Sequence, residues 1–86
     1  MVKLEVVVDN RERVNGVLKQ VIKEDRRITP EQTLVEDLGL NSLQIMEVLG
    51  LIENEFNVFV PTEMAIPIKT VGDMYKAIDE ITRSHD

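Results

Sequence analysis

Cysteine and tryptophan are absent from the 86-residue sequence, and histidine occurs only once. A chain without cysteine forms no disulfide, carries no thiolate nucleophile and offers no sulfur ligand to zinc or an iron–sulfur cluster. The single histidine, His85, lies beside the C-terminal residue, where chains tend to fray. We therefore expect neither a histidine-based triad nor a multi-histidine metal site, and the sequence predicts a protein that is not an enzyme.

Long apolar runs are also missing, since the longest one near the N-terminus is the three valines at 6–8. This run is too short for a signal peptide or a membrane span, so we expect a cytoplasmic protein. A length of 86 residues suits one domain, which we expect to span 1–86, with an irregular segment at 1–8 and a frayed tail at 84–86. The apolar share of 43% favours a folded chain over a disordered one.

Basic residues are missing from the middle of the chain. Residues 28–68 carry seven acidic side chains and no Lys or Arg, whereas residues 1–27 have a net charge of +2 and residues 69–86 of −1. This acidic centre repels phosphate backbones and anionic lipids, so we expect neither nucleic-acid nor membrane binding. It would attract a partner with a basic patch; the alternative is that it only keeps the protein in solution.

Apolar residues three and four positions apart predict a first helix from about residue 9 to residue 25, with Asp9 or Asn10 as its cap. The first eight residues also alternate as a strand would, so their conformation stays open. Residues 26–40 predict a long loop that is interrupted by a single helical turn at 29–32. We expect apolar residues to pin this loop to the core and a glycine to bend it, namely Leu34, Val35, Leu38 and Gly39.

A second helix is predicted over about residues 42–55, because Asn41 and Gln44 form a capping-box pair before a helical pattern. Its apolar residues exceed one stripe, which indicates that the helix buries two faces or offers one of them to a partner. One stripe consists of Leu43, Met46, Leu49 or Gly50, Ile52 and Phe56, and the excess consists of Ile45, Val48 and Leu51.

The rest of the chain predicts one short helix and one long helix. Residues 57–60 read as an extended connector that buries one of its valines, and Thr62 caps a short helix over 62–66. The last helix opens with a capping box at 70–73. Because a sheet needs partner strands that this chain lacks, we expect an all-α bundle of three main helices and one short one. The apolar face of the last helix consists of Val71, Met74, Tyr75, Ile78 and Ile81.

The turn at 37–43 leads into the second helix and places Ser42 at its first residue. Leucines anchor both sides of this turn, so the hydroxyl is expected on a fixed, exposed corner beside free backbone N–H groups and the positive end of the helix dipole. Such a corner suits an attached anionic group such as a phosphodiester. The alternative from the residues alone is that Asn41 and Ser42 are ordinary capping residues.

Ser42 has no histidine or lysine near it in the sequence that would act as its base. The carboxylates of Glu36 and Asp37 lie in a segment without a basic partner and are most simply a solvated acidic face. No EF-hand spacing is present, and we expect no metal site. A helix-in-groove interaction module stays open at this point.

Residues 35–43, Val-Glu-Asp-Leu-Gly-Leu-Asn-Ser-Leu, resemble the phosphopantetheine attachment segment of the acyl carrier proteins. Further landmarks follow in the family's order: residues 47–56 resemble its second helix, a Val-Pro step precedes the short third helix, and residues 68–73 resemble the entry to its last helix. The resemblance extends from about residue 11 to residue 83. It implies a four-helix acyl-carrier-protein-like bundle with a long loop between the first two helices.

The resemblance implies that Ser42 receives a 4′-phosphopantetheine arm from coenzyme A, transferred by a separate phosphopantetheinyl transferase. The arm then carries acyl intermediates as thioesters for fatty-acid, lipid or polyketide-type biosynthesis, so the cofactor supplies the thiol that the chain lacks. Asn41, Leu43 and Asp37 flank the attachment site. The expected partners are this transferase and the enzymes that load and process acyl groups through basic docking patches, and the carrier is expected to be a monomer.

The resemblance also implies a docking surface and an acyl cavity. Because clients of the family bind the acidic second helix, the docking residues carried over by position are Glu47, Glu53, Glu55, Asp37, Leu43 and Met46. The residues that would line the cavity, or alternatively form plain core, are Met46, Leu49, Ile52, Phe56, Ala65, Ile68 and Tyr75.

Three positions depart from the family pattern. Asn41 stands where Asp is usual, Gln44 replaces a frequent acid, and Gly50 replaces an apolar residue on the docking face. The loop between the first two helices is also shorter than is usual in fatty-acid carriers. These departures favour a specialised carrier. The alternatives are an aminoacyl or peptidyl carrier, and an unmodified helical adaptor that docks through its acidic helix.

Overall fold

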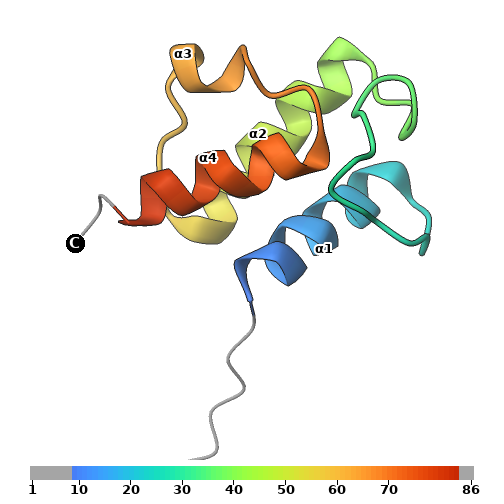
Figure 1. Ribbon diagram of the computed structural model, residues 1–86, viewed down its shortest axis with the longest axis horizontal. Coiled ribbons are helices and arrows are strands. Elements are labelled where there is room, and N and C mark those ends of the chain that lie inside the picture. Colours follow the sequence, from blue (N-terminus) through green and yellow to red (C-terminus); the bar gives the residue numbers. More distant parts are fainter. Residues whose placement is uncertain (1–8, 84–86) are drawn as a thin grey trace, which may run out of the picture.

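The computed structural model of the chain describes residues 9–83 and contains four helices. They are α1 (Asn10–Ile22), α2 (Ser42–Phe56), α3 (Thr62–Ala65) and α4 (Val71–Arg83), with a long loop between α1 and α2 (Figure 1). The described residues form no strand, only an isolated bridge between Thr33 and Thr70. The all-α prediction is therefore confirmed, while the predictions for 1–8 and 84–86 lie outside the described residues.

Helix α1 begins as predicted and ends earlier than predicted. The Asp9 carboxylate accepts the backbone N–H of Arg11 at 3.1 Å, which makes Asp9 the N-cap. At the other end Lys23 adopts a left-handed conformation with φ 64°, and its N–H donates to the carbonyl of Lys19 at 2.8 Å. This cap stops the helix at Ile22, three residues before the predicted end at Asp25, because a left-handed residue cannot continue a right-handed helix.

Helix α2 carries the predicted capping box. The Asn41 side chain accepts the N–H of Gln44 at 2.8 Å, and the Gln44 side chain accepts the N–H of Asn41 at 3.0 Å. The helix ends at Phe56, where Asn57 takes a left-handed conformation with φ 55°. Both ends of α2 are thus set by local side-chain and backbone contacts, and the predicted span of 42–55 is confirmed to within one residue.

The face that α2 buries overlaps only in part with the stripe that the spacing favoured: Ile52 and Phe56 of that stripe pack in or against the core, but Leu43 and Met46 do not. Val48 and Ile52 are fully buried, whereas Leu43 is 74% exposed and Met46 is 68% exposed. Both stripes of α2 are apolar, so periodicity alone cannot choose between them. The packing of α2 against α1 decides the matter, and it turns the stripe of Ile45, Val48 and Ile52 inward.

The core lies where α1 contacts both α2 and α4 (Figure 1). Three leucines of the long loop complete it from one side, since Leu34, Leu38 and Leu40 are buried. Val35 was expected to pin the loop as well, but it is 59% exposed, so that expectation is wrong. The largest fully buried side chains are Leu18, Leu34, Ile52, Met74, Ile78, Val14, Val48 and Val71.

Backbone hydrogen bonds tie the long loop to the start of α4. The N–H of Leu34 donates to the carbonyl of Lys69 at 3.0 Å, and the N–H of Gly72 donates to the carbonyl of Pro30 at 2.9 Å. The approach at Gly72 is so close that a Cβ there would meet the Pro30 oxygen at 3.1 Å. The helical turn predicted at 29–32 is a single hydrogen-bonded turn, in which the N–H of Gln32 donates to the carbonyl of Thr29.

The predictions around α3 and α4 are mostly confirmed. Val60 is buried in the extended connector, as expected. Thr62 is the first helical residue of α3 and not its cap, because Pro61 holds the N-cap position without a side-chain hydrogen bond. At the start of α4, the Thr70 hydroxyl accepts the N–H of Asp73 and the Asp73 carboxylate accepts the N–H of Thr70, both at 3.1 Å.

The buried stripe of α2 leads to the first prediction. Ile52→Ala is expected to lower the free energy of unfolding by about 2–5 kcal/mol, because it leaves a cavity in the core. Met46→Ala, on the exposed stripe, is expected to change it by less than about 0.5 kcal/mol. Urea unfolding of the two variants checks both values, and similar losses for the two would contradict the assigned orientation of α2.

The capping box of α4 leads to a prediction on pH. The N–H of Lys69, followed by that of Thr70, donates to the Asp73 carboxylate and holds the pKa of that carboxyl below its ordinary value of 3.8. A carboxyl with a lowered pKa stabilises the fold above its unfolded value and loses this contribution as the pH falls through the folded value. Asp73→Asn is therefore expected to cost stability at pH 7 and progressively less below about pH 4.

Urea unfolding at pH 7 and pH 3 measures this difference between the wild type and Asp73→Asn. Asp79→Asn is the matched control, because Asp79 is an exposed carboxylate of the same helix whose side chain caps no backbone N–H among residues 9–83. An equal cost of Asp73→Asn at both pH values would show that the carboxylate charge contributes nothing to the cap.

Candidate functional site

The turn before α2 is held by buried residues on both sides. Leu38 and Leu40 are buried, and Gly39 between them takes a left-handed conformation with φ 71°, which a residue with a Cβ rarely adopts. The N–H of Leu40 donates to the carbonyl of Leu34 at 2.9 Å. The predicted bend at Gly39 is thus confirmed, and it directs the chain into α2 from a fixed starting point.

Ser42 is the first residue of α2 and is exposed. The Asn41 side chain accepts the N–H of Gln44. The other backbone N–H groups of the first helical residues have no partner within the helix and face the space around the serine. The helix dipole adds partial positive charge at the same end. Within the part of the chain that the structure describes, no group of His, Asp or Glu side chains is arranged to hold a metal ion.

Asp37, predicted beside the attachment site, has a structural role in the loop. Its carboxylate accepts the N–H of Thr33 at 2.8 Å, and its own N–H donates to the Thr33 hydroxyl at 3.0 Å. The guanidinium of Arg26 donates to the Asp37 carbonyl at 3.4 Å. The sequence reading missed this reciprocal pair, although a hydroxyl residue four positions before a carboxylate is a signal for such a capped turn.

The acidic residues of α2 are not equivalent. Glu47 is exposed, and no ion pair of its carboxylate is formed with residues 9–83. The Glu53 carboxylate accepts the N–H of Val60 at 2.8 Å, which secures the connector after α2. Glu55 pairs with Arg13 of α1 at 2.9 Å. Of the three predicted docking carboxylates on this helix, only Glu47 is therefore without a partner in the described fold.

Arg13 joins α1 to the end of α2 through three contacts. Its Nε donates to the Glu55 carboxylate at 2.9 Å, and its Nη2 donates to the Glu55 carbonyl at 2.7 Å. Its guanidinium also lies over the Phe56 ring, 4.2 Å from the centroid. Phe56 was predicted to line a cavity, but it lines neither of the cavities described below.

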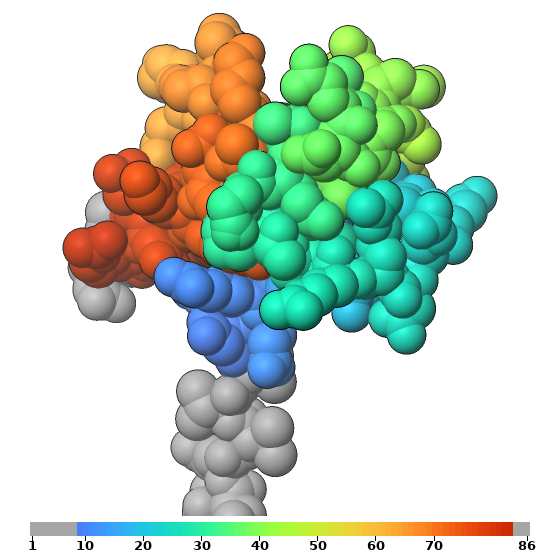
Figure 2. All heavy atoms as spheres, turned by 45° about the vertical axis from the view of Figure 1, so that its right-hand side comes forward, coloured from blue at the N-terminus to red at the C-terminus, as the bar shows by residue number. Residues whose placement is uncertain are grey.

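A cavity of about 370 Å³ lies between the long loop, α2 and α3. Figure 2 shows it as a notch between the green part of the chain and the orange part that contains α3. Ile45 of α2 lines it one helical turn from Ser42. The complete lining is Thr33, Leu34, Val35, Glu36, Ile45, Ala65, Ile66, Ile68 and Lys69, so its walls are mostly apolar and charged groups lie among them.

The predicted cavity residues divide into three groups. Ala65 and Ile68 line the cavity, while Ile52 and Tyr75 are buried in the core. The Tyr75 hydroxyl donates to the Asn15 side chain at 2.5 Å, which fixes the ring against α1.

Two further residues predicted for the cavity lie outside it. Leu49 is half-buried and lines neither cavity, and the exposure of Met46 excludes it from the interior. The lining residues that the sequence reading missed are Leu34, Val35, Ile45 and Ile66.

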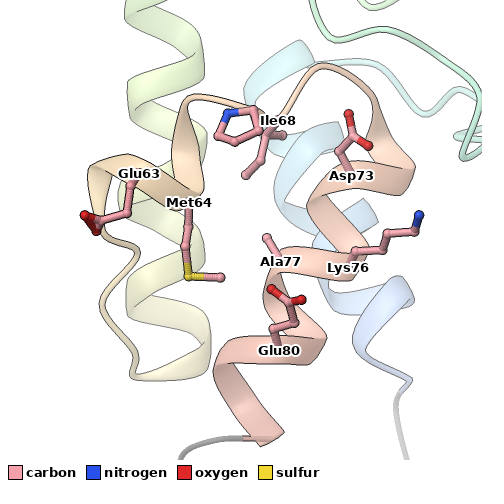
Figure 3. Close-up of a pocket in the computed structure, with 8 residues that line it drawn as sticks. Glu63, Met64, Ile68, Asp73, Lys76, Ala77 and Glu80 are labelled. Atoms are coloured by element: carbon pink, nitrogen blue, oxygen red, sulfur yellow. The ribbon is translucent and has the colours of Figure 1, made fainter.

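A second cavity of about 260 Å³ lies between α3 and α4. Figure 3 shows Met64 of α3 and Ala77 of α4 on opposite sides of it, with Ile68 at one end. Ile68 lines both cavities and so separates them. The other residues that line this second cavity are Glu63, Pro67, Asp73, Lys76 and Glu80, four of which are charged.

Comparison with known proteins adds the class of protein to this geometry. The family of phosphopantetheine attachment sites matches residues 12–78. An acyl carrier protein of Helicobacter pylori is 36% identical over 70 residues, which covers 80% of this chain and 90% of that protein. An acyl carrier protein of Wolinella succinogenes is 37% identical over 67 residues, or 72% of this chain and 88% of that protein.

A solved structure from Mycobacterium tuberculosis, described as a candidate acyl carrier protein, has the same fold. Its TM-score to this chain is 0.79 at 36% identity, and the match covers 81% of this chain and 95% of that one. The matched family and these relatives define a carrier that bears phosphopantetheine and is not itself an enzyme. The chain belongs to the acyl carrier protein family.

Membership of this family sets the general partners. A carrier of this kind is modified by a phosphopantetheinyl transferase and then meets enzymes that act on acyl groups. None of the helices within residues 9–83 is long and apolar enough to cross a bilayer.

Two glycines near the site lead to a prediction of opposite effects. Gly39→Ala is expected to lower the free energy of unfolding by about 1–2 kcal/mol, because alanine strains the left-handed turn at φ 71°. Gly50→Ala is expected to raise it by up to about 1 kcal/mol, because a Cβ at this exposed helical position meets open space. Thermal or urea unfolding measures both, and a destabilising Gly50→Ala would mean that α2 is not regular there.

Proposed function

We propose that Ser42 carries the 4′-phosphopantetheine arm and that the chain presents acyl intermediates on it as thioesters. The observation that supports this most is the position of Ser42, exposed at the first residue of α2 and inside the segment matched by the attachment-site family. The N–H groups at this helix end favour the negative charge of the phosphodiester. Asn41 caps the helix, and Leu43 is the neighbouring exposed residue that a transferase meets.

The arm supplies the thiol when it is bound, and the chain supplies a fixed attachment point and an apolar shelter. The cavity of about 370 Å³ begins one helical turn from Ser42, and apolar side chains form most of its wall. An acyl chain that folds back into this cavity leaves water, which the hydrophobic effect favours. The cargo is therefore an acyl group of fatty-acid, lipid or polyketide-type biosynthesis.

The carrier is a specialised one. Asn41 and Gln44 remove two negative charges from the positions next to Ser42 where the family usually has acids, and Gly50 removes a side chain from the exposed face of α2. Each change alters the surface that partner enzymes meet and leaves the capping box intact. One carrier unit spans residues 1–86 and acts as a monomer in the cytoplasm.

Docking of client enzymes uses the start of α2. Leu43, Met46 and Glu47 are all exposed there, whereas Glu53 and Glu55 are engaged within the fold and Asp37 caps Thr33. These engaged carboxylates are less available to a basic client than the free carboxylate of Glu47.

Intact mass spectrometry tests the attachment directly. Incubation with coenzyme A, Mg²⁺ and a broad-specificity phosphopantetheinyl transferase is expected to add one pantetheine group to the wild type and none to Ser42→Ala. Ser84→Ala is the matched control, since Ser84 is the other serine of the chain and lies outside the matched segment. An adduct on Ser42→Ala would show that the arm is attached to another residue. No adduct on the wild type would favour the unmodified adaptor.

A loading survey of the modified protein tests the cargo. Acyl-activating enzymes are expected to load it, and enzymes that activate amino acids are not, because most of the cavity wall is apolar and suits an alkyl chain. Efficient aminoacyl loading would favour the aminoacyl or peptidyl carrier instead.

A further inference from the structure

Ile68 lies between the two cavities of the bundle. Among the described residues, Ile68 alone lines both the larger cavity of about 370 Å³ and the smaller one of about 260 Å³. Figure 3 shows its side chain at one end of the smaller cavity. The side chain is half-buried and packs against the core, so it forms a wall that the two cavities share.

Backbone hydrogen bonds on both sides hold this wall in place. The N–H of Ile68 donates to the carbonyl of Ala65 at 3.1 Å. The carbonyl of the next residue, Lys69, accepts the N–H of Leu34 from the long loop at 3.0 Å. Because a β-branched side chain is also restricted about its first torsion angle, Ile68 is not free to swing aside for a ligand.

The smaller cavity has apolar side chains beyond this wall. Met64 of α3 and Ala77 of α4 lie on opposite sides of it (Figure 3), and Pro67 lines it next to Ile68. An alkyl chain that passed Ile68 would contact these groups and leave water, which the hydrophobic effect favours. The position of Ile68, and not the chemistry beyond it, therefore closes the larger cavity on this side.

Given the proposed function, an acyl chain attached through Ser42 enters the larger cavity, which Ile45 lines one helical turn from the serine. We propose that Ile68 sets the length of acyl chain that this carrier shelters. A chain fills the larger cavity as far as Ile68, and the methylenes of a longer chain stay in water. Truncation of Ile68 to alanine joins the two cavities and lets a longer chain continue to Met64 and Ala77.

Thermal unfolding of loaded carriers tests this limit. A broad-specificity phosphopantetheinyl transferase loads the full chain directly from acyl-coenzyme A, with straight acyl groups from butanoyl to hexadecanoyl. The measured quantity is the rise in Tm over the same variant with an unloaded arm, so any loss of stability caused by the substitution itself cancels. Each sheltered methylene is expected to raise Tm by about 3 °C, because its burial stabilises only the folded protein.

In the wild type the rise in Tm is expected to grow with chain length and then level off. In Ile68→Ala it is expected to continue to longer chains and to end at least about 5 °C higher. Ile68→Val, a milder truncation, is expected to give a smaller extension in the same direction. Ile66→Ala is the matched control, because Ile66 lines only the larger cavity, and it is expected to level off at the wild-type chain length.

NMR locates the chain in the same samples. In the wild type, nuclear Overhauser contacts from the alkyl chain are expected to reach Ala65, which lines only the larger cavity, and neither Met64 nor Ala77, which line only the smaller one. In Ile68→Ala, the terminal methyl group of a chain longer than the wild-type limit is expected to contact both Met64 and Ala77.

Three results would overturn the inference. Contacts from the wild-type acyl chain to Met64 or Ala77 would show that the chain passes Ile68. An unchanged limit in both Ile68 variants would show that this side chain does not set it, and an equal extension in Ile66→Ala would show that the effect is not specific to the shared wall. Absence of any adduct on the wild type is a separate result, because it overturns the proposed function on which this inference rests.

Discussion

The arrangement of this carrier depends on the backbone hydrogen bonds that hold the long loop against the start of α4. The segment at 30–34 exchanges three such bonds with the segment at 69–72, and Gly72 allows the two backbones to approach closely. With the loop held there, Leu34 and Leu38 reach the core, and the bend at Gly39 starts α2 at a defined place. The position of Ser42 and one wall of the larger cavity both follow from this contact.

In a small domain with a single simple core, the buried residues serve packing, and function is left to groups on the surface. The thirteen buried hydrophobic side chains of the core come from α1, α2, α4 and the long loop, and the described residues bury no charged or polar side chain. In the phosphopantetheine family to which the chain belongs, an attached arm supplies the reactive group. The small core also explains the roles of Glu53, Glu55 and Asp37. Their hydrogen bonds secure turns and helix ends that a larger core would hold by packing.

Local signals in the sequence predicted most of the helix boundaries and the site corner. The capping pairs Asn41–Gln44 and Thr70–Asp73 form as predicted, because each depends only on residues three apart. The buried face of α2 was not predictable in this way, since two of its stripes are apolar and the choice depends on contacts with α1. The lining of the larger cavity was not predictable from local signals either, because its wall joins segments that are distant in the sequence: 33–36, 65–66, 68–69 and Ile45.

The net charge illustrates why composition and surface are different properties. The sequence places seven acids and no base in residues 28–68, and this suggested a negative field around Ser42. In the folded chain Arg13 of α1 pairs with Glu55, whereas the carboxylates of Asp37 and Glu53 accept backbone N–H groups and keep their charge. Residues 38–46 around Ser42 have no ionisable side chain, so the central acids lie on either side of the serine and not beside it. The charge that a surface presents thus depends on where the fold places and pairs each acid, and the exposed side chains directly after Ser42 include the apolar Leu43 and Met46.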